Sequence, residues 1–99
     1  MMDFVTIMSW EPGLSREQRD EALMRRAEWK YPEGMEVIAE YWPASEDVAV
    51  VVISRAETFE PFMELEMTWS DKFHIDSHPA VSAEEGLRIG PIVMQRRDA

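Results

Sequence analysis

The chain has 99 residues, 45% of them hydrophobic, with four tryptophans, no cysteine and a formal net charge of −10. This length suits one domain with a modest core, and the lack of cysteine excludes disulfides, thiolate metal ligands and cysteine nucleophiles, which fits a cytoplasmic protein. The negative charge argues against nucleic acid and anionic membrane surfaces as partners, no apolar run reaches membrane-spanning length, and Asp3 stands where a signal peptide would carry positive charge.

The first part of the chain predicts a strand followed by a helix. Residues 4–10 are rich in β-branched and aromatic side chains and end before Pro12-Gly13, which favours a strand closed by a turn. Ser15 followed by Gln18 is typical of a capping box, so we expect a helix from there to about residue 30. The residues expected on its buried stripe are Leu23, Met24, Ala27 and Tyr31. Its basic residues, Arg16, Arg19, Arg26 and Lys30, are interpreted as a solvated face.

The middle of the chain predicts a hairpin and a second helix. Residues 35–42 and 47–54 are strand-like and separated by a short loop that begins at Pro43. Thr58 is the expected cap of the helix that follows. The apolar side chains expected on one side of that helix are Phe59, Phe62, Leu65 and Trp69.

The last part of the chain predicts a fourth strand over residues 73–78 and then an arm. Residues 82–85 predict a single helical turn broken by Gly86. The apolar residues after this glycine predict a short strand or an extended segment. We therefore interpret residues 1–99 as one ferredoxin-like domain whose C-terminal arm covers about 80–99.

This order of elements predicts an α+β fold, a ferredoxin-like βαββαβ sandwich. In it, two helices cover one face of a four-stranded antiparallel sheet. The first and third strands lie in the middle and the second and fourth at the edges. Pro79 suits an edge, where a missing N–H costs little.

The sheet face that the helices leave open is also expected to be apolar. The strand over 47–54 is apolar on both sides. If the small aliphatic side chains face the helices, the residues on the open face are Phe4, Met8, Trp10, Ile38, Trp42, Val50 and Val52. A patch of this kind in water favours association. We therefore expect a homodimer in which two sheets pack face to face as a dimeric α/β barrel, with a cavity in or beside the shared core.

The fourth strand contains both histidines of the chain. Because side chains alternate along a strand, His74, Asp76 and His78 share one face. Phe73 and Ile75 lie on the other face, which we expect to turn towards the helices. A histidine beside a carboxylate suits proton transfer, so these three polar residues are the candidate catalytic group, and at least one histidine should reach the cavity or the dimer seam. The alternative is the solvated rim of an edge strand.

A metal site on this strand is not expected. At about 3.3 Å per residue, His74 and His78 are about 13 Å apart, whereas protein ligands lie about 2 Å from zinc. No fourth ligand is evident, so we expect neither a metal nor another cofactor.

Six further side chains are candidates for lining a ligand pocket. They are Met8, Trp10, Glu40, Trp42, Glu66 and Trp69. The tryptophans serve either as walls of a pocket or as core and interface residues, and we expect Trp42 at the cavity mouth. Glu66 lies among apolar residues of the second helix. It is either a side chain reaching water from the edge of the stripe or a carboxylate facing the pocket, where burial would raise its pKa.

Four segments, 4–10, 25–34, 40–42 and 69–71, together resemble a microbial family catalogued as a domain of unknown function. The likeness covers nearly the whole chain. That family is similar in fold to the dimeric α/β-barrel group, which includes antibiotic-biosynthesis-type monooxygenases, haem-degrading enzymes and small isomerases. The resemblance implies a dimer and a pocket between sheet and helices, and it assigns no catalytic residue.

Two classes of function remain open. One is a cofactor-independent monooxygenase or isomerase for a small aromatic or polyketide-like molecule, in which His74 or His78 with Asp76 moves a proton. The other is a non-catalytic module for small-molecule binding or for interaction, whose aromatic face holds the dimer together. A polar-lined void favours the first class, and a barrel filled by its own side chains favours the second.

Overall fold

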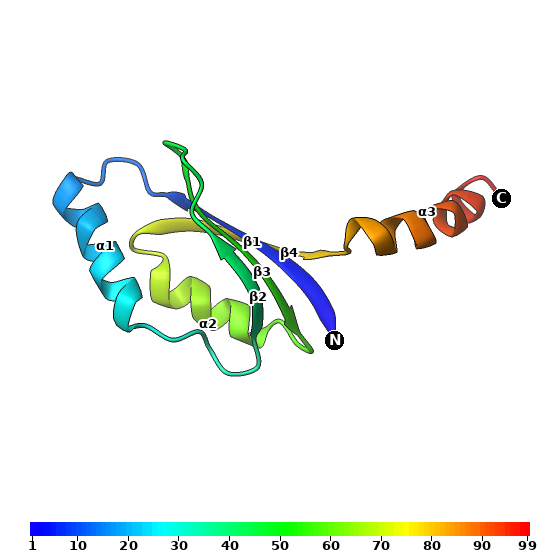
Figure 1. The fold of residues 1–99 in the computed structure, drawn as a ribbon, viewed down its shortest axis with the longest axis horizontal. Helices are drawn as coiled ribbons and strands as arrows, with labels where there is room; N and C mark the ends of the chain where they lie inside the picture. Colours follow the sequence, from blue (N-terminus) through cyan, green and yellow to red (C-terminus); the bar gives the residue numbers. More distant parts are fainter.

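The structure, a computed structural model, describes all 99 residues. In chain order the elements are β1 (Met2–Trp10), α1 (Arg16–Glu28), β2 (Glu36–Tyr41), β3 (Val48–Ala56), α2 (Glu60–Trp69), β4 (Phe73–Ala80) and α3 (Ala83–Arg97). The four strands form one sheet in the order β2-β3-β1-β4, with every neighbouring pair antiparallel. Helices α1 and α2 lie on one side of this sheet (Figure 1). The predicted ferredoxin-like topology is confirmed, with β1 and β3 central.

Local signals explain where the first two helices begin. The predicted capping box is present: the Gln18 amide donates to Ser15 Oγ, and the Ser15 amide donates to Gln18 Oε1. The predicted cap of α2 is wrong, because Phe59 rather than Thr58 is the N-cap residue and makes no side-chain hydrogen bond. Helix α2 starts instead with Pro61 in its first turn, where a missing N–H leaves no bond unmade.

The large side chains of β1 pack against the helices, which corrects the predicted orientation of the sheet. Phe4 and Met8 are each only 5% exposed and belong to the core. In the β1–β4 register Met8 lies opposite Ile75, and Trp10 lies opposite Phe73. Paired residues share a face, so the large residues of β1 must lie on the same side as the apolar residues of β4. Of the residues expected on the open face, those that pack in or against this core are Phe4, Met8, Trp10, Val50 and Val52.

The open face of the sheet is aliphatic instead. Ile7 lies opposite Val51, and Val5 lies opposite Ile53, so these four residues alternate with the buried ones. All four keep part of their surface in water. The open face therefore has an aliphatic centre on β1 and β3 in place of the expected aromatic patch, and polar side chains of β4 and the ion pair of Arg55 with Asp3 border it.

A register shift in β2 changes the face on which its second half lies. Glu36 pairs with Arg55, whereas Glu40 pairs with Val52, and the shift falls between Val37 and Ala39. Val52 is fully buried under the helices. A bulge adds one residue to a strand, so it reverses the alternation beyond it. Glu40 is thereby turned to the helix side, away from the face of Glu36.

The buried stripe predicted for α1 is wrong. Ala22 is the only buried residue of the helix, while Leu23 is 51% exposed and Met24 and Ala27 are also exposed. Helix α1 ends at Glu28, so Tyr31 lies beyond it. The physical reason is that α1 does not close onto the sheet, and a pocket separates the two.

The C-terminal segment forms one continuous helix rather than a single turn. Ser82 caps α3 by accepting from the Glu85 amide, and the helix runs through Gly86, Gly90 and Pro91. No residue of α3 is buried. The helix projects away from the sheet (Figure 1). None of the helices has the length and apolar character that a membrane crossing requires.

Candidate ligand-binding pocket

A pocket of about 270 Å³ lies on the helix side of the sheet. Eleven of its 15 lining residues are hydrophobic. From the helices and the loop after α1 it is lined by Arg19, Asp20, Ala22, Leu23, Arg26, Trp29, Tyr31 and Trp69. From the sheet and its adjoining loop it is lined by Met8, Trp10, Glu40, Trp42, Ala49, Val50 and Phe73. An apolar cavity of about 150 Å³ holds benzene, so this pocket has room for a molecule of one or two rings.

Large aromatic rings keep the pocket open. Trp29 meets Trp69 edge to face, with ring centroids 5.5 Å apart. Phe73 lies 5.7 Å from Trp69 and 4.7 Å from Trp10, measured between ring centroids. Rigid rings in mutual contact cannot collapse into the space between α1 and the sheet, as flexible aliphatic side chains would. The aromatic residues therefore form walls.

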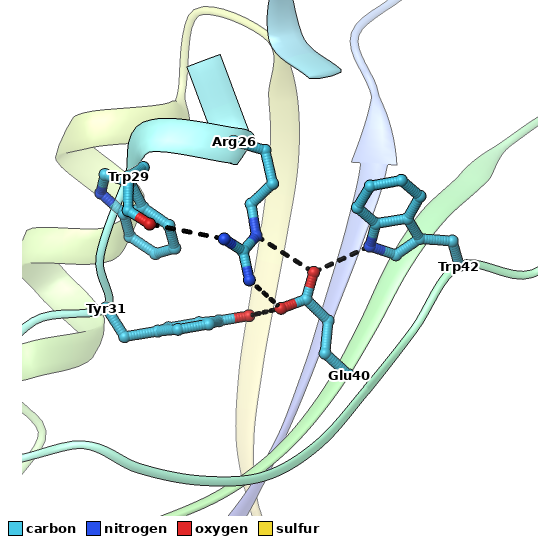
Figure 2. Close-up of polar contacts among 5 residues, drawn as sticks. All are labelled: Arg26, Trp29, Tyr31, Glu40 and Trp42. Carbon is cyan, nitrogen blue, oxygen red and sulfur yellow. Dashed lines mark hydrogen bonds and ion pairs between the residues drawn. The ribbon is translucent and has the colours of Figure 1, made fainter. Parts of the chain in front are cut away.

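The carboxylate of Glu40 is the centre of a polar network at this pocket (Figure 2). Arg26 donates to it twice, from Nη2 at 2.6 Å and from Nε at 3.2 Å. The Tyr31 hydroxyl donates at 2.5 Å and the Trp42 indole N–H at 2.8 Å. Arg26 also donates from Nη1 to the backbone oxygen of Trp29. Four donor groups on three residues thus occupy one carboxylate. These bonds fix the positions of the three donor side chains and of Glu40.

Each titratable group of this network is held in one protonation state. Burial alone would raise the pKa of Glu40, but the hydrogen bonds from Arg26, Tyr31 and Trp42 outweigh it and hold that pKa below its ordinary value. Burial and the hydrogen bond to Glu40 raise the pKa of Tyr31. The hydrogen bond to Glu40 also raises the pKa of Arg26. At neutral pH the carboxylate is therefore charged and the phenol neutral.

A second ion pair, between Arg25 and Asp71, contacts Trp69 and is separate from the Glu40 network. The Arg25 guanidinium lies 4.1 Å from the centre of the Trp69 ring. It donates to both carboxylate oxygens of Asp71, at 2.9 and 3.2 Å. A cation over an indole face adds attraction, and the two-point pairing sets the plane of the guanidinium. This arrangement connects the C-terminal half of α1 to the end of α2.

The structure gathers five of the six candidate ligand-contacting residues at this one pocket. These are Met8, Trp10, Glu40, Trp42 and Trp69. Glu66 lies on the exposed side of α2 and does not line the pocket. Trp42 is more than half exposed, in the position of a rim residue.

The candidate catalytic residues lie on the open face of the sheet, as the alternation of β4 predicts. His74, Asp76 and His78 are all exposed, and none of them lines the pocket. His74 Nε2 is 3.5 Å from Asp76 Oδ2, and both side chains are largely in water. No group of three or more His, Asp and Glu side chains is arranged to hold a metal ion. Within one chain, the sheet separates these residues from the pocket.

Sequence reasoning missed Arg19, Arg26 and Tyr31 as pocket residues. From sequence, the two arginines are expected on a solvated face and Tyr31 on a helical stripe. The signal that could have found them is Glu40 itself. A carboxylate turned towards a core needs a cation and donors, and the nearest segment rich in both is 25–31.

The fold and the site define a small ferredoxin-like α+β domain with an aromatic pocket between its first helix and its sheet. The chain belongs to the family described as a domain of unknown function (DUF3303), whose model matches residues 2–91. The resemblance to such a family is thereby confirmed. Among solved structures, the chain is similar to 30S ribosomal protein S6 from Thermotoga maritima, with 12% identity over 91% of this chain and 97% of that chain and a TM-score of 0.47. No functionally curated protein matches it.

Proposed function

We propose that this protein binds a small planar aromatic molecule in the pocket between α1 and the sheet. The observation that carries the proposal is an apolar space of about 270 Å³ walled by aromatic rings and bordered by one fully engaged polar network. Apolar walls with a few fixed polar groups are typical of small-molecule sites. Flat rings lining a narrow space favour a flat ligand, which can stack against them.

Binding without catalysis is the better-supported class. General acid–base catalysis requires a group whose pKa lies near the working pH. The pKa of Glu40 is lowered and the pKa values of Tyr31 and Arg26 are raised, so these three groups do not exchange protons at neutral pH. The polar network therefore orients the pocket walls. A monooxygenase or isomerase of the dimeric α/β-barrel group would need a further proton-moving residue at this pocket.

Replacing Trp42 with Ala should weaken binding of a neutral two-ring probe, 2-naphthamide, by at least fivefold. Trp42 lines the pocket, and its indole N–H donates to Glu40, so the variant loses both a wall and one of the four donors. Isothermal titration calorimetry measures the affinity, and circular dichroism should show unchanged secondary structure. Tyr41→Ala is the matched control, since Tyr41 precedes it and does not line the pocket. Equal affinities for wild type and Trp42→Ala would contradict a ligand site here.

We also propose that the protein assembles as a homodimer, with the open sheet face as the interface. This face carries Val5, Ile7, Val51 and Ile53, and each chain also exposes apolar side chains along α3. An isolated helix of 15 residues is marginal in water, and Gly86, Gly90 and Pro91 weaken it further. A symmetric second copy supplies apolar surface for the open sheet face and for α3 at once. In that arrangement His74, Asp76 and His78 lie along the seam.

Light scattering at micromolar concentration should give about twice the mass of one chain. Ile7→Glu should reduce it to the mass of one chain, because the new carboxylate lies beside Asp76 in the register and would be desolvated in the interface. Ile7 is 37% exposed, so the isolated chain tolerates the charge. Met67→Glu, on the exposed side of α2, is the control. A wild-type protein that stays monomeric would refute the dimer.

A further inference from the structure

We propose that the pocket ligand is an aromatic acid, whose carboxylate is bound by Arg19 while its ring lies against the aromatic walls. This inference rests on the proposed function and makes it more specific. It follows from the hydrogen-bonding groups that the pocket leaves free. The free group that lies against an aromatic wall is the guanidinium of Arg19, which carries only donors, so the complementary ligand carries acceptors.

The main acceptor of the pocket is already occupied. Both oxygens of Glu40 receive two hydrogen bonds each, from Arg26 and Tyr31 on one oxygen and from Arg26 and Trp42 on the other. A carboxylate has about four lone-pair sites. Glu40 therefore has no capacity left for a donor on the ligand. Its charge is also balanced by Arg26, so it neither attracts a cation nor needs one.

Arg19 is a free cation at the same pocket. Its guanidinium lies 5.0 Å from the centre of the Trp10 ring, and both residues line the pocket. None of the seven ion pairs in the structure involves Arg19. A guanidinium has five N–H donors in a plane that matches a carboxylate. An acid whose ring lies near Trp10 would bring its carboxylate within reach of these donors.

Trp69 lines the pocket, while its indole nitrogen is buried. The residue is only 2% exposed, and its indole N–H has no hydrogen-bond partner. Asp20 is the one remaining charged residue of the lining. Like Arg19 it is exposed and makes no ion pair. Arg19 differs from it in lying over the ring of Trp10, where the ring of a bound acid would also lie.

Three probes with the same ring system and different charges test the inference. They are 2-naphthoate, 2-naphthamide and 2-naphthylmethylammonium, titrated calorimetrically into the full-length protein at pH 7 and 50 mM salt. We expect 2-naphthoate to bind about tenfold more tightly than the neutral amide. Raising the salt to 500 mM should reduce this difference, because a pairing near the surface is screened.

Arg19→Gln identifies the residue that recognises the acid. The variant should bind 2-naphthoate about tenfold less tightly and leave the affinity for 2-naphthamide within twofold of wild type. Arg16→Gln removes the same charge from the same helix at a residue that does not line the pocket, and it should retain the preference for the acid. Circular dichroism of both variants verifies that they are folded.

The outcomes separate this inference from the proposed function. Equal affinities of wild type for the acid and the amide, or an acid preference that survives Arg19→Gln, overturn the inference and leave the aromatic pocket intact. Tightest binding of the ammonium probe also overturns it, with Asp20 as the charge that is recognised. If none of the three probes binds, the proposed function fails and the inference fails with it.

Discussion

Replacing Trp69 with Ala should lower the free energy of unfolding by about 3–5 kcal/mol, the usual cost of deleting a buried Trp side chain. Trp69 is nearly fully buried and contacts the core on several sides: Trp29 edge to face, Phe73, and the Arg25 guanidinium over its ring. A domain of this size has a total stability of roughly 5–15 kcal/mol. The variant should therefore be marginally folded at 25 °C.

Urea denaturation followed by circular dichroism measures this loss. Met67→Ala is the matched control, because Met67 lies on the same helix and is 79% exposed. Its effect should stay within about 0.5 kcal/mol, as is usual for surface substitutions. A cost below about 1 kcal/mol for Trp69→Ala would mean that the indole does not pack as described here.

Replacing Glu40 with Gln should lower the free energy of unfolding by about 2 kcal/mol at pH 7, since it leaves Arg26 without its counter-ion at a partly buried site. The expected loss of unfolding free energy is smaller than for a fully buried pair, because about a third of the Arg26 side chain is in water. Glu36→Gln, at an exposed position of the same strand, is the control and should have little effect.

The stability difference between wild type and Glu40→Gln should shrink as the pH falls. The pKa of Glu40 in the folded protein lies below its ordinary value of 4.5. Between these two pKa values the unfolded chain binds more protons at this residue than the folded one, so the contribution of Glu40 is complete above pH 4.5 and is lost as the pH falls through the lowered pKa. The urea midpoints of wild type and Glu40→Gln at several pH values from 7 to 3 measure this difference. A difference that stays constant over this range would contradict the network.

The pocket could be predicted from sequence only in part, and β2 shows why. Strict alternation places Glu36 and Glu40 on one face of a strand. The register shift between Val37 and Ala39 separates them and turns Glu40 towards the helices, where it meets Arg26 and Tyr31. A bulge is chosen by how two strands pair, so the residues of β2 alone do not reveal it.

The α3 helix illustrates a different limit. Gly86 and Pro91 are strong local signals against a helix, and they predicted a single turn followed by an arm. The structure instead has one helix over Ala83–Arg97, none of whose residues is buried. In the proposed homodimer, a second copy would supply the apolar surface that α3 lacks within its own chain, and local helix propensity does not include that surface.

The sequence by itself determined the four strands, the first two helices, the order of these elements and the two side-chain sets of β1, β3 and β4. These depend on local periodicity, on turn residues such as Pro12-Gly13 and on the capping box at Ser15, all of which lie within a few residues of one another. For β1, β2 and β3, only the tertiary structure decided which set faces the helices, because alternation defines two faces without saying which is inside. The pairing of Met8 with Ile75 decided it for β1, and the bulge in β2 decided it for Glu40. The pocket exists because these two long-range pairings place aromatic walls and one carboxylate on the same side of the sheet.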